Sequence, residues 1–130
     1  MQTILIVFLG GAIGSVGRYY GANLIMQLSG GTFPFGTMFV NVTGAIVIGF
    51  VAGLAAPESP FLINPRVRLF LMTGVCGGYT TFSTFSLETF SLLNDGQWLT
   101  ASLNAGASVF LCITAVWIGM TAARLLGGGV

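Results

Sequence analysis

Four long apolar stretches make up nearly the whole of this 130-residue chain, and short polar or Pro- and Gly-rich interruptions separate them. The interruptions fall at residues 29–31, 57–60 and 94–96. A helix that crosses the hydrocarbon core of a bilayer needs about 20 mostly apolar residues, and each stretch reaches that length. The pattern predicts an all-α integral membrane protein with a single domain over residues 1–130. Its four expected transmembrane helices cover residues 3–28, 35–55, 66–93 and 98–126.

The composition supports a membrane protein and excludes several classes of function. Only 5% of the residues are charged and 55% are hydrophobic, whereas a soluble domain has about 25% charged residues. The net charge of +1 offers no basic surface to a nucleic-acid partner. The chain lacks histidine, and Cys76 and Cys112 lie in apolar stretches, which is typical of small buried hydrophobes rather than of a disulfide or metal ligands. We therefore expect no enzymatic activity and no organic cofactor.

The arginines give a weak signal for orientation in the membrane. Arg66, Arg68 and Arg124 would lie on the same side as the N-terminus, while the other two loops contain no basic residue. The positive-inside rule then favours a cytoplasmic location for both termini. Three arginines are a small bias, so insertion in both orientations stays open.

Glycines recur on one face of the first two predicted helices. They are spaced by four, three and four residues in the first helix and by four residues in the second. Such spacing lets two helix backbones approach closely. It predicts tight packing, either between helices of one chain or in a dimer. The residues are Gly10, Gly14, Gly17 and Gly21 in the first helix and Gly49 and Gly53 in the second.

Polar side chains inside the spans form stripes, which we expect to face protein or water because each costs free energy in hydrocarbon. Thr37 and Asn41 lie one turn apart on the second helix, and Asn104 and Ser108 do so on the fourth. Glu88 is a carboxylate within the third span. Its favoured interpretation is a helix-end residue that is solvated or hydrogen-bonded to hydroxyl neighbours, and the alternative is a proton relay.

Arg18 within the first span also has two interpretations. It either snorkels or pairs with a carbonyl, or it is a fixed positive charge in a water-filled vestibule that raises the local anion concentration. The sequence leaves both open.

The most unusual segment is GVCGGYTTFSTF, over residues 74–85 of the third span. Its adjacent glycines predict a break in this helix near Gly77–Thr80, where freed carbonyls could coordinate a cation. Phe82 and Phe85 are three residues apart and project from one face. Because an aromatic ring has a positive edge, these two rings could hold a partly dehydrated anion while hydroxyl and amide groups replace its lost water.

This segment resembles the third-helix motif of the Fluc/CrcB fluoride channels. Residues 10–18 of the first helix and 36–44 of the second extend the resemblance over essentially the whole chain. The resemblance implies a fluoride-selective channel that exports fluoride passively across the bacterial cytoplasmic (inner) membrane. It also implies a multi-pass, dual-topology protein that forms an antiparallel homodimer, with two pores at the interface.

The resemblance further assigns roles to individual residues. It implies that the ring edges of Phe82 and Phe85 meet fluoride and that Asn41 contacts the pathway. The backbone carbonyls of Gly77 and Thr80, from both subunits, would hold a structural sodium ion at the dimer centre. The other residues implied along the fluoride pathway are Arg18, Asn104 and Ser108. Thr81, Ser83 and Thr84 are weaker assignments, either to the pore lining or to local backbone bonding.

Two positions depart from the family pattern, and two other functions compete with it. Asn104 stands where many members have tyrosine, and Cys112 stands where a hydroxyl residue would continue the polar track.

The main alternative function is a small dual-topology, proton-coupled multidrug exporter. That class needs a membrane carboxylate, typically in the first helix, and this first helix has none. A non-transporting structural subunit would leave the polar stripes without a role.

Overall fold

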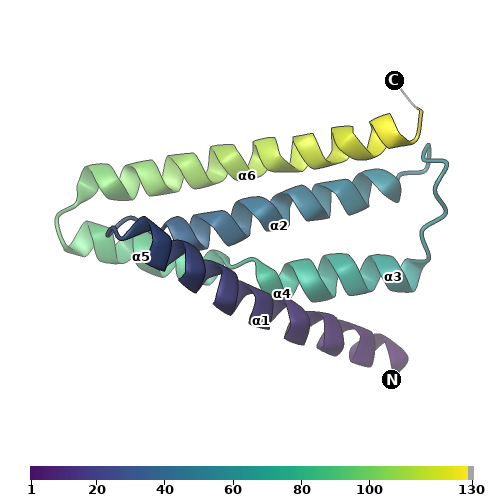
Figure 1. The fold of residues 1–130 in the computed structure, drawn as a ribbon, viewed down its shortest axis with the longest axis horizontal. Coiled ribbons are helices and arrows are strands. Elements are labelled where there is room, and N and C mark those ends of the chain that lie inside the picture. The colour runs from purple at the N-terminus through teal and green to yellow at the C-terminus, as the bar shows by residue number, and fades with distance from the viewer. Residues whose placement is uncertain (129–130) are drawn as a thin grey trace.

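The computed structural model describes residues 1–128 and is built of helices (Figure 1). The third predicted span, which we call the third crossing, is interrupted. Its first part, residues 65–79, is a continuous run of helical turns with a wider π-helix in the middle, and its second part is a separate α-helix that begins at Phe82. In chain order the elements are α1 (Gln2–Ser29), α2 (Phe35–Leu54), α3 (Pro65–Leu69), η1 (Phe70–Cys76), α4 (Gly77–Tyr79), α5 (Phe82–Asn94) and α6 (Trp98–Leu126).

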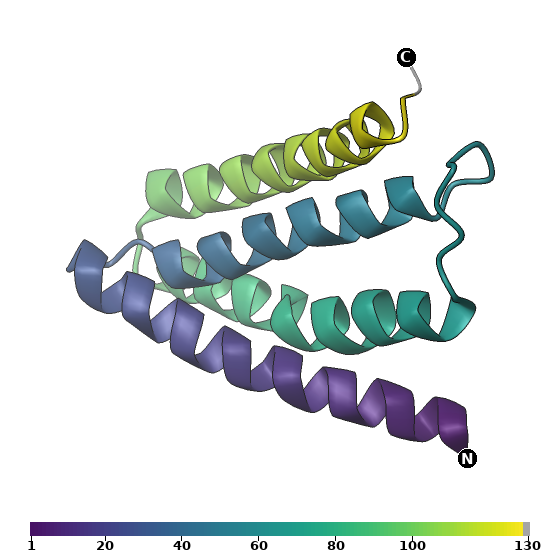
Figure 2. The same ribbon diagram turned by 45° about the vertical axis from the view of Figure 1, so that its right-hand side comes forward.

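The helices run alongside one another as four crossings, with α2 packed between α6 and α1 (Figures 1 and 2). Within residues 1–128, three helices are long and apolar enough to span a membrane: α1, α2 and α6. The third crossing is made by α3, η1, α4 and α5, which lie end to end. The start of α1 and the end of α6 lie at the same end of the bundle, as expected for an even number of crossings.

The ends of the helices follow from local sequence. Asn64 caps α3, because its Oδ1 accepts a hydrogen bond of 2.8 Å from the backbone N–H of Arg66, and Pro65 occupies the first helical position. Gly30 ends α1 in a left-handed conformation with φ of 60°, where a side chain would be strained. The helix boundaries therefore lie within two residues of the predicted spans.

Glycines set the close contact between α2 and α6. A Cβ atom added at Gly49 would collide with the backbone carbonyl of Val116, and one added at Gly53 would lie 2.7 Å from the Cβ of Ala123. Gly119 makes the corresponding close contact from α6, since a Cβ there would collide with the carbonyl of Ile46. These small residues let the two backbones touch along their length.

A second glycine contact joins α1 to the third crossing. A Cβ at Gly10 would lie 2.8 Å from the Cα of Gly74, and one at Gly14 would lie 2.8 Å from the backbone nitrogen of Tyr79. On the opposite side, a Cβ at Gly78 would lie 3.0 Å from the Cα of Gly11. Both predicted glycine stripes therefore pack helices within one chain.

Candidate functional site

The third crossing is broken at Thr80 and Thr81, slightly later than the glycine pair suggested. Thr80 has φ and ψ of −87° and 157°, and Thr81 has −150° and 113°, so both are extended. Gly77 is helical, with φ and ψ of −63° and −35°. The predicted break near Gly77–Thr80 is therefore correct at Thr80, the last residue of that range, but not at Gly77. Gly78 serves the close packing against α1 and not the distortion itself.

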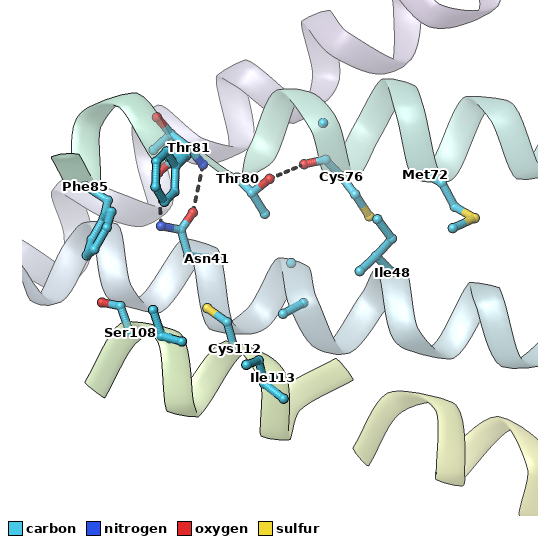
Figure 3. Close-up of a pocket in the computed structure, with 15 residues that line it drawn as sticks. Asn41, Ile48, Met72, Cys76, Thr80, Thr81, Phe85, Ser108, Cys112 and Ile113 are labelled. Atoms are coloured by element: carbon cyan, nitrogen blue, oxygen red, sulfur yellow. Dashed lines mark hydrogen bonds between the residues drawn. The ribbon is translucent and has the colours of Figure 1, made fainter. Parts of the chain in front are cut away.

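Asn41 of α2 replaces the helical hydrogen bonds that the break removes. The backbone N–H of Thr81 donates to Asn41 Oδ1 at 2.7 Å, and Asn41 Nδ2 donates to the carbonyl of Thr81 at 3.1 Å (Figure 3). Thr81 is only 7% exposed, so these backbone groups have no access to bulk water. In a continuous helix the N–H of Thr81 would bond to the carbonyl of Gly77, which is left without that donor.

Arg18 of α1 reaches the same break from the other side. Its Nη1 donates to the carbonyl of Thr80 across 3.4 Å, a long hydrogen bond. This contact is the carbonyl pairing that the sequence left open, and Arg18 also lines a hollow of about 350 Å³. Among the residues of this hollow, Ser15, Arg18 and Asn23 can donate to an anion, whereas the hydroxyl protons of Thr37 and Thr81 are given to Glu88 and Thr84. A vestibule role for Arg18 therefore stays a prediction.

A groove of about 420 Å³ lies between α2, the third crossing and α6 (Figure 3). It brings together residues that the sequence placed on three separate helices. Among the predicted pathway and cation residues, those that line it are Asn41, Gly77, Thr80, Thr81, Phe82, Phe85 and Ser108. Cys76 and Cys112 also line it, and both thiols are free.

The two phenylalanines form a pair at the mouth of this groove. Their ring centroids are 5.4 Å apart and their planes are inclined by 45°. Phe82 is 77% exposed in the single chain, whereas Phe85 is half-buried. An exposed aromatic ring beside a polar break is therefore open to a ligand or to a second protein surface.

Hydroxyl groups organise the start of α5. Thr81 Oγ1 accepts from the backbone N–H of Thr84 at 3.2 Å and so caps this helix. It also lies 3.0 Å from Thr84 Oγ1 and 3.2 Å from Ser83 Oγ. Ser83 and Thr84 are exposed and do not line the groove, although Thr84 lines the hollow beside Arg18, so their place on the pathway stays a prediction.

Asn104 does not face the groove. It is 1% exposed, and its Nδ2 donates to Thr89 Oγ1 across 2.8 Å. Ser108 does line the groove, and its hydroxyl donates to Asn104 Oδ1 at 3.4 Å. The polar stripe predicted on the fourth helix therefore splits into a buried amide and a groove-facing hydroxyl.

Glu88 is hydrogen-bonded to a hydroxyl, as its favoured interpretation expects, and the proton relay stays an untested alternative. Thr37 Oγ1 donates to Glu88 Oε1 at 2.8 Å, and Oε2 is buried without a hydrogen-bond partner within residues 1–128. The polar residues could be located in the sequence, but the pairing of Thr37 with Glu88 could not be predicted. The two residues are 51 positions apart, so no local pattern links them.

Tyr79 and Thr43 form a second pair that the sequence did not indicate. Thr43 Oγ1 donates to the carbonyl of Phe39 at 2.7 Å. Its single proton is used there, so Tyr79 donates its hydroxyl proton to Thr43 across 3.0 Å. The Tyr79 ring also occupies the space beside Gly17 and Gly21, which accounts for the second half of the glycine stripe on α1.

Comparison with known proteins places the chain in one family. The model of the family described as CrcB-like protein, Camphor Resistance (CrcB), matches residues 5–120. A protein of Opitutus terrae named Fluoride-specific ion channel FluC is 52% identical over 123 residues, which cover 95% of this chain and 93% of that protein. Proteins with the same name from Rhodospirillum rubrum (47% identical, 99% and 100% covered) and Paramagnetospirillum magneticum (45%, 97% and 98%) are also similar.

These matches agree with the spanning helices in describing a multi-pass protein of the cell membrane. The match covers the broken third crossing, α2 with Asn41, and α6 with Ser108, so it includes the groove as well as the fold. The chain belongs to the CrcB family.

Proposed function

We propose that this protein is a fluoride-selective channel that lets fluoride leave the cell passively. The name of the similar proteins supports this substrate. The observation that carries the proposal is the groove at the helix break, which combines two phenylalanine rings with amide and hydroxyl donors and has no carboxylate among its lining residues in the described chain. Such a lining suits a small anion and offers no negative charge that would repel it.

The groove supplies replacements for the water that fluoride loses. The positive edges of Phe82 and Phe85 offer weak electrostatic contacts, and the hydroxyl of Ser108 offers a hydrogen bond. Asn41 spends one amide hydrogen on the carbonyl of Thr81, and its second amide hydrogen is available to an anion. Arg18 adds a positive charge on the far side of Thr81, which raises the local anion concentration.

The protein functions as an antiparallel homodimer in this proposal. Backbone and hydroxyl groups at membrane depth cannot face lipid without partners. Phe82, Ser83 and Thr84 are nevertheless exposed beside the break in the single chain, and Phe82 also lines the groove. A second copy in the opposite orientation would cover this surface and complete two pores at the interface.

A structural sodium ion at the dimer centre is the second part of the proposal. The residues present fit such an ion, because the carbonyl of Gly77 has lost its helical donor to Asn41 and Gly77 lines the groove. The carbonyl of Thr80 accepts the long bond from Arg18 and keeps a second lone pair. Two carbonyls from each subunit would supply oxygen ligands, and the ion would hold the subunits together.

Fluoride efflux from liposomes tests the proposed function. Purified protein is reconstituted into vesicles loaded with fluoride, and an ion-selective electrode records its appearance outside, with chloride-loaded vesicles as the control. We expect fluoride efflux far above that of protein-free vesicles and little chloride efflux. Absence of fluoride efflux would overturn the proposal, and efflux that requires a proton gradient would favour the exporter class instead.

A further inference from the structure

Ser108 is hydrogen-bonded differently from four other hydroxyl residues in the helices of this chain. The hydroxyls of Thr43, Ser86, Thr89 and Thr114 each donate to the backbone carbonyl four residues earlier, at 2.7 or 2.8 Å. Ser108 instead donates to the side chain of Asn104 across 3.4 Å. Its proton is therefore in a weak bond, while the other hydroxyl protons are in short ones.

The orientation of the Asn104 amide follows from its neighbour on α5. Thr89 gives its single hydroxyl proton to the carbonyl of Phe85 at 2.7 Å, so its oxygen can only accept from Asn104. The 2.8 Å contact with Thr89 is thus made by Asn104 Nδ2, which leaves Oδ1 to face Ser108. Because Asn104 is 1% exposed, no bulk water competes for either atom.

We infer that Asn104 is a positioning residue that keeps the proton of Ser108 available to an anion in the groove. This inference rests on the proposed function. When fluoride reaches the groove, the Ser108 hydroxyl rotates away from Asn104 Oδ1 and donates to the ion. The step breaks only a long hydrogen bond, and no covalent bond changes.

Without the Asn104 side chain, Ser108 would behave like its counterparts. Its hydroxyl would turn to the backbone carbonyl of Asn104, four residues earlier, and form the short bond seen at Thr89 and Thr114. Donation to an anion would then cost a full hydrogen bond. The amide at residue 104 therefore acts on fluoride through Ser108 and not by direct contact.

A double-mutant cycle in the liposome efflux assay tests this inference. We expect Asn104→Leu and Ser108→Ala each to slow fluoride efflux by about threefold to tenfold, the factor that corresponds to one neutral hydrogen bond. The double variant should be within about twofold of Ser108→Ala alone, because the two residues act through one hydroxyl. Thr114→Val, which removes a backbone-bonded hydroxyl of α6 outside the groove, is the matched control and should leave efflux unchanged.

A second variant keeps the test decisive if Asn104→Leu does not fold. Thr89→Val leaves Asn104 in place but removes the acceptor that orients its amide, so efflux should fall by a smaller factor, and that loss should vanish in the Ser108→Ala background. Losses that multiply in both double variants would overturn the inference, since Asn104 and Thr89 would then act independently of Ser108. Wild-type vesicles without fluoride efflux would instead overturn the proposed function.

Discussion

The packing of α1 against the third crossing makes Gly14 one of the least replaceable residues of the fold. A Cβ atom at this position would collide with the carbonyl of Val75 and would lie 2.8 Å from the nitrogen of Tyr79 and 3.1 Å from the carbonyl carbon of Gly78. All three are backbone atoms, so no side chain can rotate away. Gly14→Ala therefore forces α1 away from η1 and α4.

The cost can be estimated and compared with a neighbouring glycine. Overpacking a tight site costs about 1–3 kcal/mol, and helix propensity returns at most about 1 kcal/mol for Gly→Ala. After this gain is subtracted, we expect Gly14→Ala to lower the free energy of unfolding by up to about 2 kcal/mol. Gly11, three residues earlier on the same helix, has no atom within 4 Å of an added Cβ, so Gly11→Ala should be neutral or slightly stabilising.

The measurement is the free energy of unfolding of each purified variant in detergent, from titration with a denaturing detergent followed by circular dichroism. Wild type, Gly11→Ala and Gly14→Ala are compared at one protein concentration, because association shifts apparent stability. If Gly14→Ala is as stable as Gly11→Ala, the close contact between α1 and the third crossing does not contribute to stability as the distances imply.

Three further substitutions test the break and the groove. Asn41→Leu should lower the free energy of unfolding in the same titration by about 1–3 kcal/mol, because the N–H of buried Thr81 loses its acceptor while the carbonyl keeps its bond within α5; unchanged stability would contradict this. Phe82→Ile and Phe85→Ile should slow fluoride efflux while size-exclusion chromatography still shows an assembled protein, and unchanged efflux in both would remove the rings from the mechanism. Gly77→Val should weaken the dimer on the same column by disturbing the proposed cation site. An added Cβ meets no atom closer than 3.9 Å within the chain, so the effect should not come from a clash inside one subunit. A stable, active dimer would contradict that site.

The helices of this protein could be predicted from sequence because their signals are local. Apolar length, the proline before α3 and the glycine after α1 each act within a few residues, so the predicted spans and the observed helices nearly coincide. The composition of residues 74–85 likewise indicated a break in the third helix. Spacing alone placed Asn41, Phe85 and Ser108 on polar faces, and these three residues meet in one groove.

Other features depend on contacts between distant segments and had no local signal. The glycine pair suggested a distortion at Gly77, but Gly78 is required by contact with α1 and the chain becomes extended only at Thr80. The bond between Thr37 and Glu88 joins α2 to α5. The burial of Asn104 behind Ser108 depends on how α6 is rotated against α5, which the spacing along one helix cannot specify.

The break in the third crossing is stable because side chains of two neighbouring helices, α1 and α2, bond to its backbone groups. Asn41 satisfies both backbone groups of Thr81, and Arg18 reaches the carbonyl of Thr80. Because the N–H of Thr81 donates to Asn41, the carbonyl of Gly77 loses the donor that it would have in a continuous helix. A carbonyl without a partner is costly at membrane depth unless it lies against protein or water. The side chain that makes the break tolerable therefore leaves free the carbonyl that the proposed cation site uses.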